Sequence, residues 1–375
     1  MSQIPAVHTK AAVLSAMGAS QPYAASQPLS LKSLDLAPPG PGELLVRIEA
    51  AGLCHSDLSV VNADRPRPLP MALGHEAVAR VEAAGPGARL QPGARVVMAF
   101  LPACGHCDAC HRGEPWLCSN GAAANGKGEL LGGGFRLSDC GHPVHHHLGL
   151  SAFATHAVID ERSCVVIDDD IPAEIAALFG CAVLTGVGAV FNSAVVRPGE
   201  SVAVWGLGGV GLAALLGAVA AGAEPVIAID PVPEKRALAL ELGARAAVAP
   251  ADVAEAFAKY GAPRVAIESV GSGKVLAEAY RTAARGGRIV TVGLPNPADP
   301  FTIPAVSLVA EAKTIIGSYM GSAVPARDIP RYVALWRAGR LPVERLLSCV
   351  RPMAEINAAL DALASGQAIR QILIP

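Results

Sequence analysis

SVAVWGLGGVGLAALLGAVAAGAEPVIAID, residues 201–230, joins a short apolar run, a glycine-rich loop, an Ala/Leu-rich segment and a second apolar run that ends at Asp230. The loop, Gly206-Leu207-Gly208-Gly209-Val210-Gly211, has the spacing G-x-G-x-x-G. We predict a buried strand before the loop, a helix after it and a second strand at Val226–Ile229. In such a loop the glycines permit a tight turn, close approach to a pyrophosphate and close packing of helix on strand. The stretch therefore predicts a dinucleotide-binding fold, although a glycine-rich turn of another α/β domain is the alternative.

The same stretch favours one nicotinamide cofactor. The helix after the loop begins with unpaired N–H groups and a partial positive charge, which suit a pyrophosphate. Asp230 lies about twenty residues beyond the loop, where a carboxylate can accept hydrogen bonds from a ribose diol. Because that carboxylate repels a 2′-phosphate, the sequence favours NAD over NADP. Lys235, which we also expect at the cofactor, and Arg236 keep NADP open as an alternative.

Length and composition limit the class of protein. A chain of 375 residues suggests two domains, and 52% hydrophobic with only 17% charged residues suggests a well-packed soluble protein. A net charge of −2 gives no reason to expect a nucleic-acid partner or a charged membrane surface. We recognise neither a membrane span nor a signal peptide, so we expect a cytoplasmic protein without a membrane partner.

The pattern of strands changes along the chain. Up to about residue 182, short strand-like runs and Pro/Gly-rich turns, as at Lys10–Leu14 and Glu43–Ala50, predict an antiparallel, barrel-like domain. From about Val183, strands alternate with helices, which predicts a doubly wound parallel sheet and an α/β fold class. We interpret Asn120–Gly134 as an exposed loop and Ala368–Ile374 as a strand that returns to the first domain.

Four cysteines lie close together at metal-ligand spacing. Cys104, Cys107, Cys110 and Cys118 form a C-x2-C-x2-C-x7-C pattern, so that one short loop can surround an ion. Four thiolates close the coordination sphere of a tetrahedral zinc, which makes such a site structural. An iron–sulfur cluster or free reduced thiols are the alternatives. His106 and His111 are interpreted as bystanders, and the run of histidines at 145–147 as residues that pack and form hydrogen bonds.

Three further candidate ligands, Cys54, His75 and Cys181, are far apart and unremarkable when taken singly, since a buried cysteine is usually a small core residue. Their contexts carry a resemblance. Cys54-His-Ser-Asp57, Gly74-His75-Glu76, Gly85-Pro-Gly87, the four-cysteine segment and the glycine-rich loop follow one another in this order. The whole chain thereby resembles the zinc-containing medium-chain alcohol dehydrogenase family, in its long-loop, NAD-dependent form.

The resemblance implies a domain plan. A GroES-like, β-rich catalytic domain is expected at residues 1–182, with a structural zinc lobe at about 102–120. A Rossmann coenzyme domain is expected at 183–318, and residues 319–375 are expected to return to the catalytic domain.

The resemblance also implies a catalytic zinc on Cys54, His75 and Cys181, so that each subunit would hold two zinc ions. Three protein ligands leave the fourth position open for water or alcohol. By the same resemblance, Ser56 takes the alcohol proton, Asp57 orients the ligating imidazole and Glu76 is an acid near the metal. Many relatives carry a histidine where this chain has Ser59, so proton exit would pass through water or the cofactor ribose.

Further residues match cofactor and substrate positions of the family. His55 and Arg370 are expected near the pyrophosphate, Thr185 and Val210 against the nicotinamide, and Val292 and Leu294 on the loop that frames it. Phe100, Ala123, Leu148 and Leu294 match walls of the substrate pocket. Ala122 stands where glutathione-dependent formaldehyde dehydrogenases carry an arginine, which argues against that substrate.

These matches predict an NAD-dependent zinc dehydrogenase acting on a primary, medium to large apolar or aromatic alcohol or its aldehyde. A polyol or threonine-type dehydrogenase of the same superfamily is the first alternative, and a non-enzymatic protein that binds NAD and zinc is the second. The long-loop form favours a homodimer over a tetramer.

Overall fold

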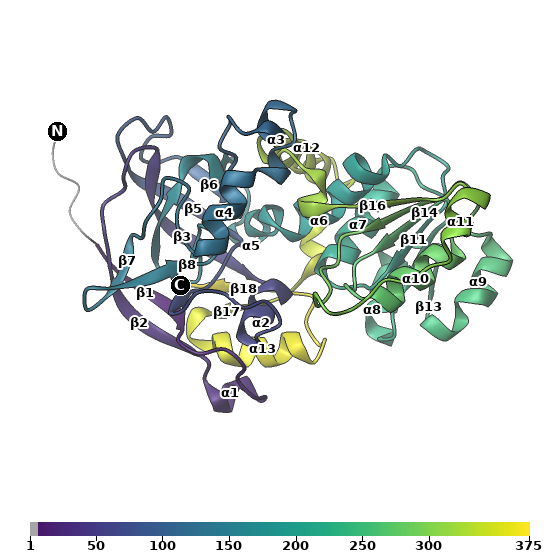
Figure 1. The fold of residues 1–375 in the computed structure, drawn as a ribbon, viewed down its shortest axis with the longest axis horizontal. Coiled ribbons are helices and arrows are strands. Elements are labelled where there is room, and N and C mark those ends of the chain that lie inside the picture. Colours follow the sequence, from purple (N-terminus) through teal and green to yellow (C-terminus); the bar gives the residue numbers. More distant parts are fainter. Residues whose placement is uncertain (1–6) are drawn as a thin grey trace. The chain divides into compact units, whose positions relative to one another are not determined.

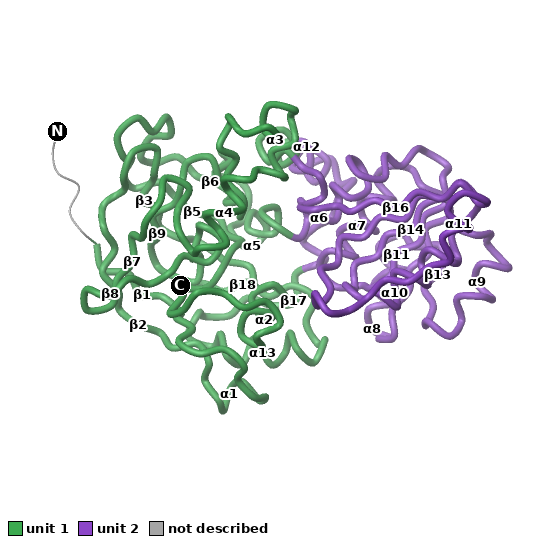
Figure 2. Tube along the Cα trace, in the orientation of Figure 1, with its two compact units in different colours: residues 1–181, 324–330, 347–375 green, residues 182–323, 331–346 purple. Residues whose placement is uncertain are grey.

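The computed structural model describes residues 7–375 and divides into two compact units (Figure 2). Of the described residues, unit 1 takes those up to Cys181 together with 324–330 and 347–375. Unit 2 takes 182–323 and 331–346. Unit 1 is thus assembled from three separate pieces of chain.

Among the described residues of unit 1, the strands form a closed barrel and a second, larger sheet (Figure 1). The barrel has the order β1-β2-β7-β8-β4, and the sheet has the order β10-β6-β5-β3-β18-β17, with β9 also paired to β3. The strands are β1 Val7–Leu14, β2 Leu29–Leu36, β3 Glu43–Leu53, β4 Met71–Ala72, β5 Ala77–Ala84, β6 Arg95–Met98, β7 Leu137–Asp139, β8 His142–His146, β9 His156–Asp160, β10 Cys164–Val166, β17 Leu347–Pro352 and β18 Arg370–Ile374. The α-helices are α1 Tyr23–Ser26, α2 His55–Val61, α3 Asp108–His111, α4 Ser119–Lys127, α5 Ala173–Ala176 and α13 Ile356–Ala364.

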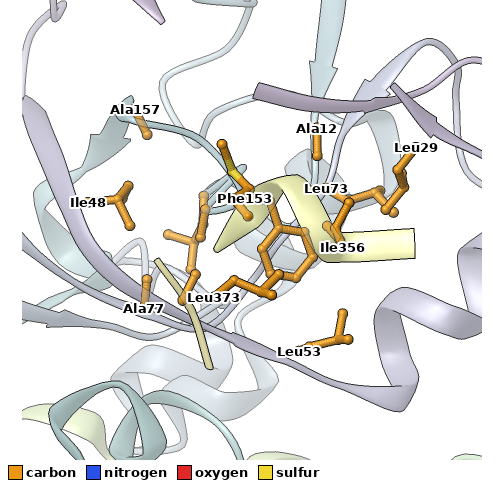
Figure 3. Close-up of a cluster of buried hydrophobic side chains, with 14 of the residues drawn as sticks. Ala12, Leu29, Ile48, Leu53, Leu73, Ala77, Phe153, Ala157, Ile356 and Leu373 are labelled. Atoms are coloured by element: carbon orange, nitrogen blue, oxygen red, sulfur yellow. The ribbon is translucent and has the colours of Figure 1, made fainter. Parts of the chain in front are cut away.

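Buried apolar side chains hold unit 1 together. Phe153 lies in a cluster with Leu53, Leu73 and Ile356, each 1% exposed or less (Figure 3). Leu373 of the C-terminal strand β18 belongs to the same cluster and is 1% exposed. Removing such side chains from water is the main driving force of folding. The last strand of the chain is therefore part of the core of unit 1.

Unit 2 is built on one six-stranded parallel sheet in the order β13-β12-β11-β14-β15-β16 (Figure 1). Its strands are β11 Val202–Trp205, β12 Val226–Ile229, β13 Ala246–Val248, β14 Val265–Glu268, β15 Arg288–Thr291 and β16 Thr314–Gly317. Its helices are α6 Ala182–Gly188, α7 Gly209–Ala220, α8 Pro233–Glu241, α9 Val253–Tyr260, α10 Gly273–Thr282 and α11 Ala305–Ala310, while α12 Pro325–Arg337 contains residues of both units. The strand order reverses between β11 and β14, and ligands bind such sheets at this kind of switch point.

The predicted fold class, a β-rich domain plus a doubly wound parallel sheet, is confirmed. One local prediction is wrong, because the supposed loop at 120–134 begins with helix α4. The thiol of Cys118 accepts a hydrogen bond from the N–H of Gly121, which caps the helix, and Gly128 ends it with φ +69°. Strands β16 and β17 were not anticipated.

Within residues 7–375, none of the helices alone meets the length and hydropathy expected of a membrane span. The helical segments Ala173–Gly180 and Ala182–Ala194 reach that length and hydropathy only when they are taken together, and the chain bends by 51° between them.

Candidate metal centres and cofactor loop

The end of β3 and the start of α2 present the first candidate ligand. Cys54 is the N-cap of α2, and its thiol and the Asp57 carboxylate form a reciprocal capping box. Asp57 Oδ2 accepts a hydrogen bond from the Cys54 N–H at 3.0 Å. Ser56 follows in the first turn, with its Oγ 4.0 Å from Cys54 Sγ. One short cap thus orders a thiol, a hydroxyl and a buried carboxylate.

The second candidate ligand depends on a glycine. Gly74 has φ +96°, and a Cβ there would lie 2.4 Å from the backbone nitrogen of Phe153. Both facts require glycine at this position. The tight passage leads the chain to His75 and Glu76, which are 1% and 0% exposed.

The structure brings Cys54, His75 and Cys181 together within unit 1. Their ligand atoms all lie within 4.8 Å of one another, and Cys181 Sγ is 3.7 Å from His75 Nε2. Zinc bonds of 2.0–2.3 Å in a tetrahedron place neighbouring ligand atoms roughly 3.5 Å apart. The three residues therefore fit a zinc ion that keeps one coordination position for a ligand.

The charges of this group favour a cation. A hydrogen bond from Cys181 lowers the pKa of the Cys54 thiol well below its ordinary value, against the opposing effect of burial. The same hydrogen bond, together with burial, raises the pKa of Cys181. A thiol with a lowered pKa suits zinc, because zinc binds thiolates.

Asp57 and Glu76 form a second layer around these ligands. Asp57 Oδ1 accepts a hydrogen bond from His75 Nδ1 at 2.9 Å, which turns Nε2 towards Cys181. Burial favours the neutral ring, but the charge and hydrogen bond of Asp57, together with those of Cys54, outweigh it and raise the pKa of His75 well above its ordinary value. Burial also opposes the Asp57 charge, but the charges and hydrogen bonds of His75 and His147 together lower the pKa of Asp57.

Glu76 pairs with Arg370 from β18, and both side chains are buried. Burial raises the pKa of Glu76 despite the arginine. Glu76 Oε2 has no hydrogen-bond partner in the described part of the chain. A Cβ at Gly52 would lie 2.4 Å from Glu76 Oε1, so glycine makes room for this ion pair.

The four cysteines form a separate group, in which backbone N–H groups hold the sulfurs in place. The sulfurs of Cys104, Cys107, Cys110 and Cys118 lie within 4.8 Å of one another, which fits a closed tetrahedral site. Cys104 Sγ accepts the N–H of Cys107 at 3.3 Å, and Cys118 Sγ accepts the N–H of Cys104 at 3.2 Å. A hydrogen bond from the Cys110 backbone lowers the pKa of Cys107 to about 5. Burial raises the pKa of Cys110 to about 12.

In unit 2 the glycine-rich loop joins β11 to α7. Gly206 has φ +86°, and a Cβ at Gly211 would lie 1.8 Å from the Gly206 carbonyl oxygen. A Cβ at Gly208, by contrast, would meet nothing within 4 Å. The loop therefore leaves space beside Gly208 and the first residues of α7, Gly209 and Val210, as a bound pyrophosphate requires.

Asp230 follows β12 beside this loop. Its Oδ2 accepts the Leu207 N–H at 2.7 Å, and its Oδ1 accepts the Val232 N–H at 2.9 Å. Arg236 donates to the carbonyl oxygens of Asp230 and Pro231. Lys235 lies half-buried on α8. The Asp230 carboxylate thus stabilises the glycine-rich loop, and the Arg236 guanidinium lies beside it.

The remaining expected site residues fall into different surroundings. In unit 1, the ring of Phe100 meets that of His75 edge to face at 5.7 Å, Leu148 is buried and His55 is exposed. In unit 2, Thr185 is 9% exposed, Val292 is half-buried and Leu294 is 54% exposed.

Ala123 departs from its expected place. It is exposed on α4 and lines a hollow with Cys104 and His106, so the structure gives no support for an apolar wall at this position. The expectation came from matching positions along the chain, whereas helix α4 turns this side chain outwards.

Sequence reasoning missed three supporting residues. His147 lies against Asp57, Gly52 makes room for the Glu76–Arg370 pair, and Ser269 donates to the carbonyl oxygens of Trp205 and Gly206. Only His147 stands in a conspicuous pattern, the run of histidines, which the sequence led us to interpret as residues that pack and form hydrogen bonds.

A three-ligand metal group, a four-cysteine lobe and a dinucleotide-type loop in one chain define a zinc-binding dehydrogenase. Residues 209–337 match the family model described as "Zinc-binding dehydrogenase", and residues 40–169 match the "Alcohol dehydrogenase GroES-like domain". The chain belongs to the zinc-containing medium-chain alcohol dehydrogenase family.

Named relatives cover nearly the whole chain. Geraniol dehydrogenase of Castellaniella defragrans is 41% identical over 92% of this chain and 94% of its own. NDMA-dependent alcohol dehydrogenase of Amycolatopsis methanolica is 37% identical over 98% of each chain. The crystal structure of benzyl alcohol dehydrogenase from Acinetobacter calcoaceticus has a TM-score of 0.91 and 33% identity, and covers 98% of this chain and 99% of its own. The protein is thus an oxidoreductase of alcohols and aldehydes that uses zinc and a nicotinamide cofactor.

Proposed function

We propose that this protein is an NAD-dependent zinc dehydrogenase of medium to large apolar or aromatic primary alcohols, with two zinc ions per chain. The observation that carries the proposal is the convergence of Cys54, His75 and Cys181 beside the Ser56 hydroxyl. The relatives named for geraniol and for benzyl alcohol support the substrate class.

The proposed roles follow from position. Cys54, His75 and Cys181 would hold the catalytic zinc, and the four-cysteine lobe would hold a structural one. Bound zinc supplies a Lewis acid that lowers the pKa of an alcohol. Ser56 Oγ, two residues beyond a ligand, would take the alcohol proton while passing its own hydroxyl proton on to water or the cofactor ribose. Asp57 fixes the tautomer and direction of His75, while Glu76 remains a buried acid balanced by Arg370.

The cofactor would bind unit 2 at the glycine-rich loop and the start of α7. NAD held there would supply the hydride acceptor for oxidation of the alcohol. Thr185, Val210, Val292 and Leu294 would flank the nicotinamide, and Lys235 would lie near the adenosine ribose. From unit 1, His55 and Arg370 would supply positive charge for the phosphates. The expected domain plan of 1–182, 183–318 and 319–375 is kept in the proposal with a difference in its third part, since residues 319–323 and 331–346 belong to unit 2. A homodimer and a cytoplasmic location complete the proposal.

The substrate assignment is tested with a panel. Purified protein is assayed with a terpene alcohol, benzyl alcohol, ethanol, sorbitol and threonine, and NAD, NADP and NDMA are supplied separately as acceptors. We expect the apolar and aromatic primary alcohols to give the highest kcat/KM with NAD. A higher kcat/KM for sorbitol or threonine would replace this proposal with the polyol or threonine-type alternative.

The cofactor assignment is tested at Asp230. Asp230→Asn removes the charge and keeps one acceptor oxygen in place of the two that hold the Leu207 and Val232 N–H groups. Because hydrogen bonds to charged groups contribute about 1.5–3 kcal/mol, the NAD-to-NADP preference should fall roughly 10- to 100-fold. The measurement is kcat/KM with each cofactor, and Asp230→Glu, which keeps the charge, is the matched control. An unmodified protein that prefers NADP would contradict the assignment.

A further inference from the structure

One imidazole of the histidine run, that of His147, lies beside the candidate zinc site. His147 is 1% exposed, and its Nδ1 lies 3.3 Å from Asp57 Oδ1, the oxygen that also accepts from His75. The His147 and His75 rings meet edge to face at 5.4 Å. Two buried imidazoles therefore lie against one carboxylate oxygen.

The chain around His147 fixes its direction. Its N–H lies within hydrogen-bond distance of Ala72 O, 3.3 Å, and Ser151 Oγ, 3.2 Å, and its carbonyl accepts from Leu150 and Ser151. Within this turn, Leu148 and Ser151 have φ of +51° and +50°, a conformation that side chains other than glycine rarely adopt. A turn that holds this conformation keeps the imidazole aimed at Asp57.

The Nδ1 atom of His147 needs a partner. It is buried and forms no hydrogen bond of good geometry with any residue that the structure describes. A buried polar atom without a partner is destabilising, and native structures contain few of them. Asp57 Oδ1, which lies 3.3 Å away, is the acceptor at hand.

Asp57 in turn needs donors. The carboxylate is 0% exposed, and it holds the Cys54 N–H through Oδ2 and the His75 ring through Oδ1. Each donor stabilises a buried negative charge, and two or three are typical of a carboxylate that stays ionised. Because Asp57 contacts two candidate zinc ligands, any displacement of it moves both.

We propose that His147 is a positioning residue, which donates an Nδ1–H hydrogen bond to Asp57 and thereby holds Cys54 and His75 in place for the catalytic zinc. The inference rests on the proposed function, since it assigns zinc to the Cys54 group. His147 acts through Asp57 and contacts neither the alcohol nor the cofactor.

The test compares His147→Phe with His147→Asn. Phenylalanine keeps an aromatic edge against His75 but has no donor, whereas the asparagine amide lies near the position of Nδ1. Zinc release to a chelator is followed over time, with the lobe zinc as an internal reference. We expect His147→Phe to lose the catalytic zinc roughly 10- to 100-fold faster, as for other residues that support metal ligands. His147→Asn should restore most of the retention.

His146→Gln is the matched control. His146 is buried one residue away, but its Nε2 accepts the Arg136 N–H at 3.0 Å, and glutamine can keep that bond. Zinc release from this variant should equal that of the unmodified protein. If His147→Phe does not fold, His147→Gln replaces it, because its amide lies near Nε2 and misses Asp57.

The results of these experiments distinguish a failure of the inference about His147 from a failure of the proposed function. If the unmodified protein oxidises alcohol with two zinc ions but the phenylalanine and asparagine variants release zinc at equal rates, His147 only packs and the inference is wrong. A third zinc per chain would show that Asp57, His75 and His147 bind metal themselves, and would also overturn it. If the unmodified protein holds no zinc at the Cys54 group, the proposed function fails first.

Discussion

The two cysteine-containing groups of unit 1 bring their candidate metal ligands together in different ways. The lobe draws its four sulfurs from residues 104–118 and holds them with backbone N–H groups, leaving Cys107 and Cys110 half-exposed. The Cys54 group draws its ligands from positions 54, 75 and 181, buries all three and supports them with side chains. Local chain geometry is enough for the first group, whereas the second exists only when the β-rich unit has folded.

The largest effects are expected when one ligand is replaced in each of the two groups. His75→Ala should leave one zinc per chain and an intact fold, with alcohol oxidation reduced roughly 10³-fold or more because the Lewis acid is lost. Cys107→Ser should instead lower stability, on the order of several kcal/mol, because structural zinc contributes to folding. Metal analysis, thermal unfolding and kcat distinguish the two. If Cys107→Ser left stability unchanged and removed only turnover, the comparison would be reversed.

Removing a hydroxyl beside the Cys54 group is the next test. Ser56→Ala should retain both zinc ions and cofactor binding while losing alcohol oxidation by roughly 10²–10⁴-fold, because the alcohol proton has no acceptor. The loss should lessen at high pH, where hydroxide takes the proton. Ser59→Ala is the control, since Ser59 Oγ donates to the His55 carbonyl at 2.8 Å and is occupied. A Ser56→Ala enzyme with normal kcat would show that the proton leaves by another route.

The smallest difference that we expect between the two groups is in the reactivity of their thiols. In metal-free protein, Cys107 should alkylate at least roughly tenfold faster than Cys54 at neutral pH, because both pKa values are lowered but only Cys107 is accessible. Since the pKa of Cys107 is about 5, its thiolate is present above that value and its reaction should fade as the pH falls through it. Mass spectrometry of labelled peptides measures both rates. Equal rates would mean that burial does not separate the two groups.

The sequence predicted best what is encoded locally. The glycine-rich loop and the four-cysteine spacing each lie within one short segment, so that spacing alone implies geometry, and both segments have the expected form. The convergence of Cys54, His75 and Cys181 could not be derived from spacing, and it was anticipated only through the family resemblance.

Side-chain direction was predicted least well. The setting of His147 depends on the turn at Leu148, and the setting of Ala123 depends on helix α4, so neither can be derived from the sequence pattern. In α4, a run of Gly and Ala resembles a loop in composition, and the capping thiol of Cys118 that favours a helix was assigned only to zinc. The sequence alone does not reveal that Cys118, a candidate zinc ligand, also caps a helix.

The assembly of unit 1 from separate pieces of chain sets an order of maturation. During synthesis the lobe has all its sulfurs once residue 118 has emerged, and it can take up metal at that stage. Glu76 must wait for Arg370, 294 residues later, and the core around Phe153 waits for Leu373 of the same strand. Until then the nascent chain carries Glu76 without its counter-charge and an open edge beside β3, to which β18 pairs. The candidate catalytic centre is therefore among the last parts of unit 1 to be completed, and a chain truncated before β18 would carry the four-cysteine lobe without the Glu76–Arg370 pair.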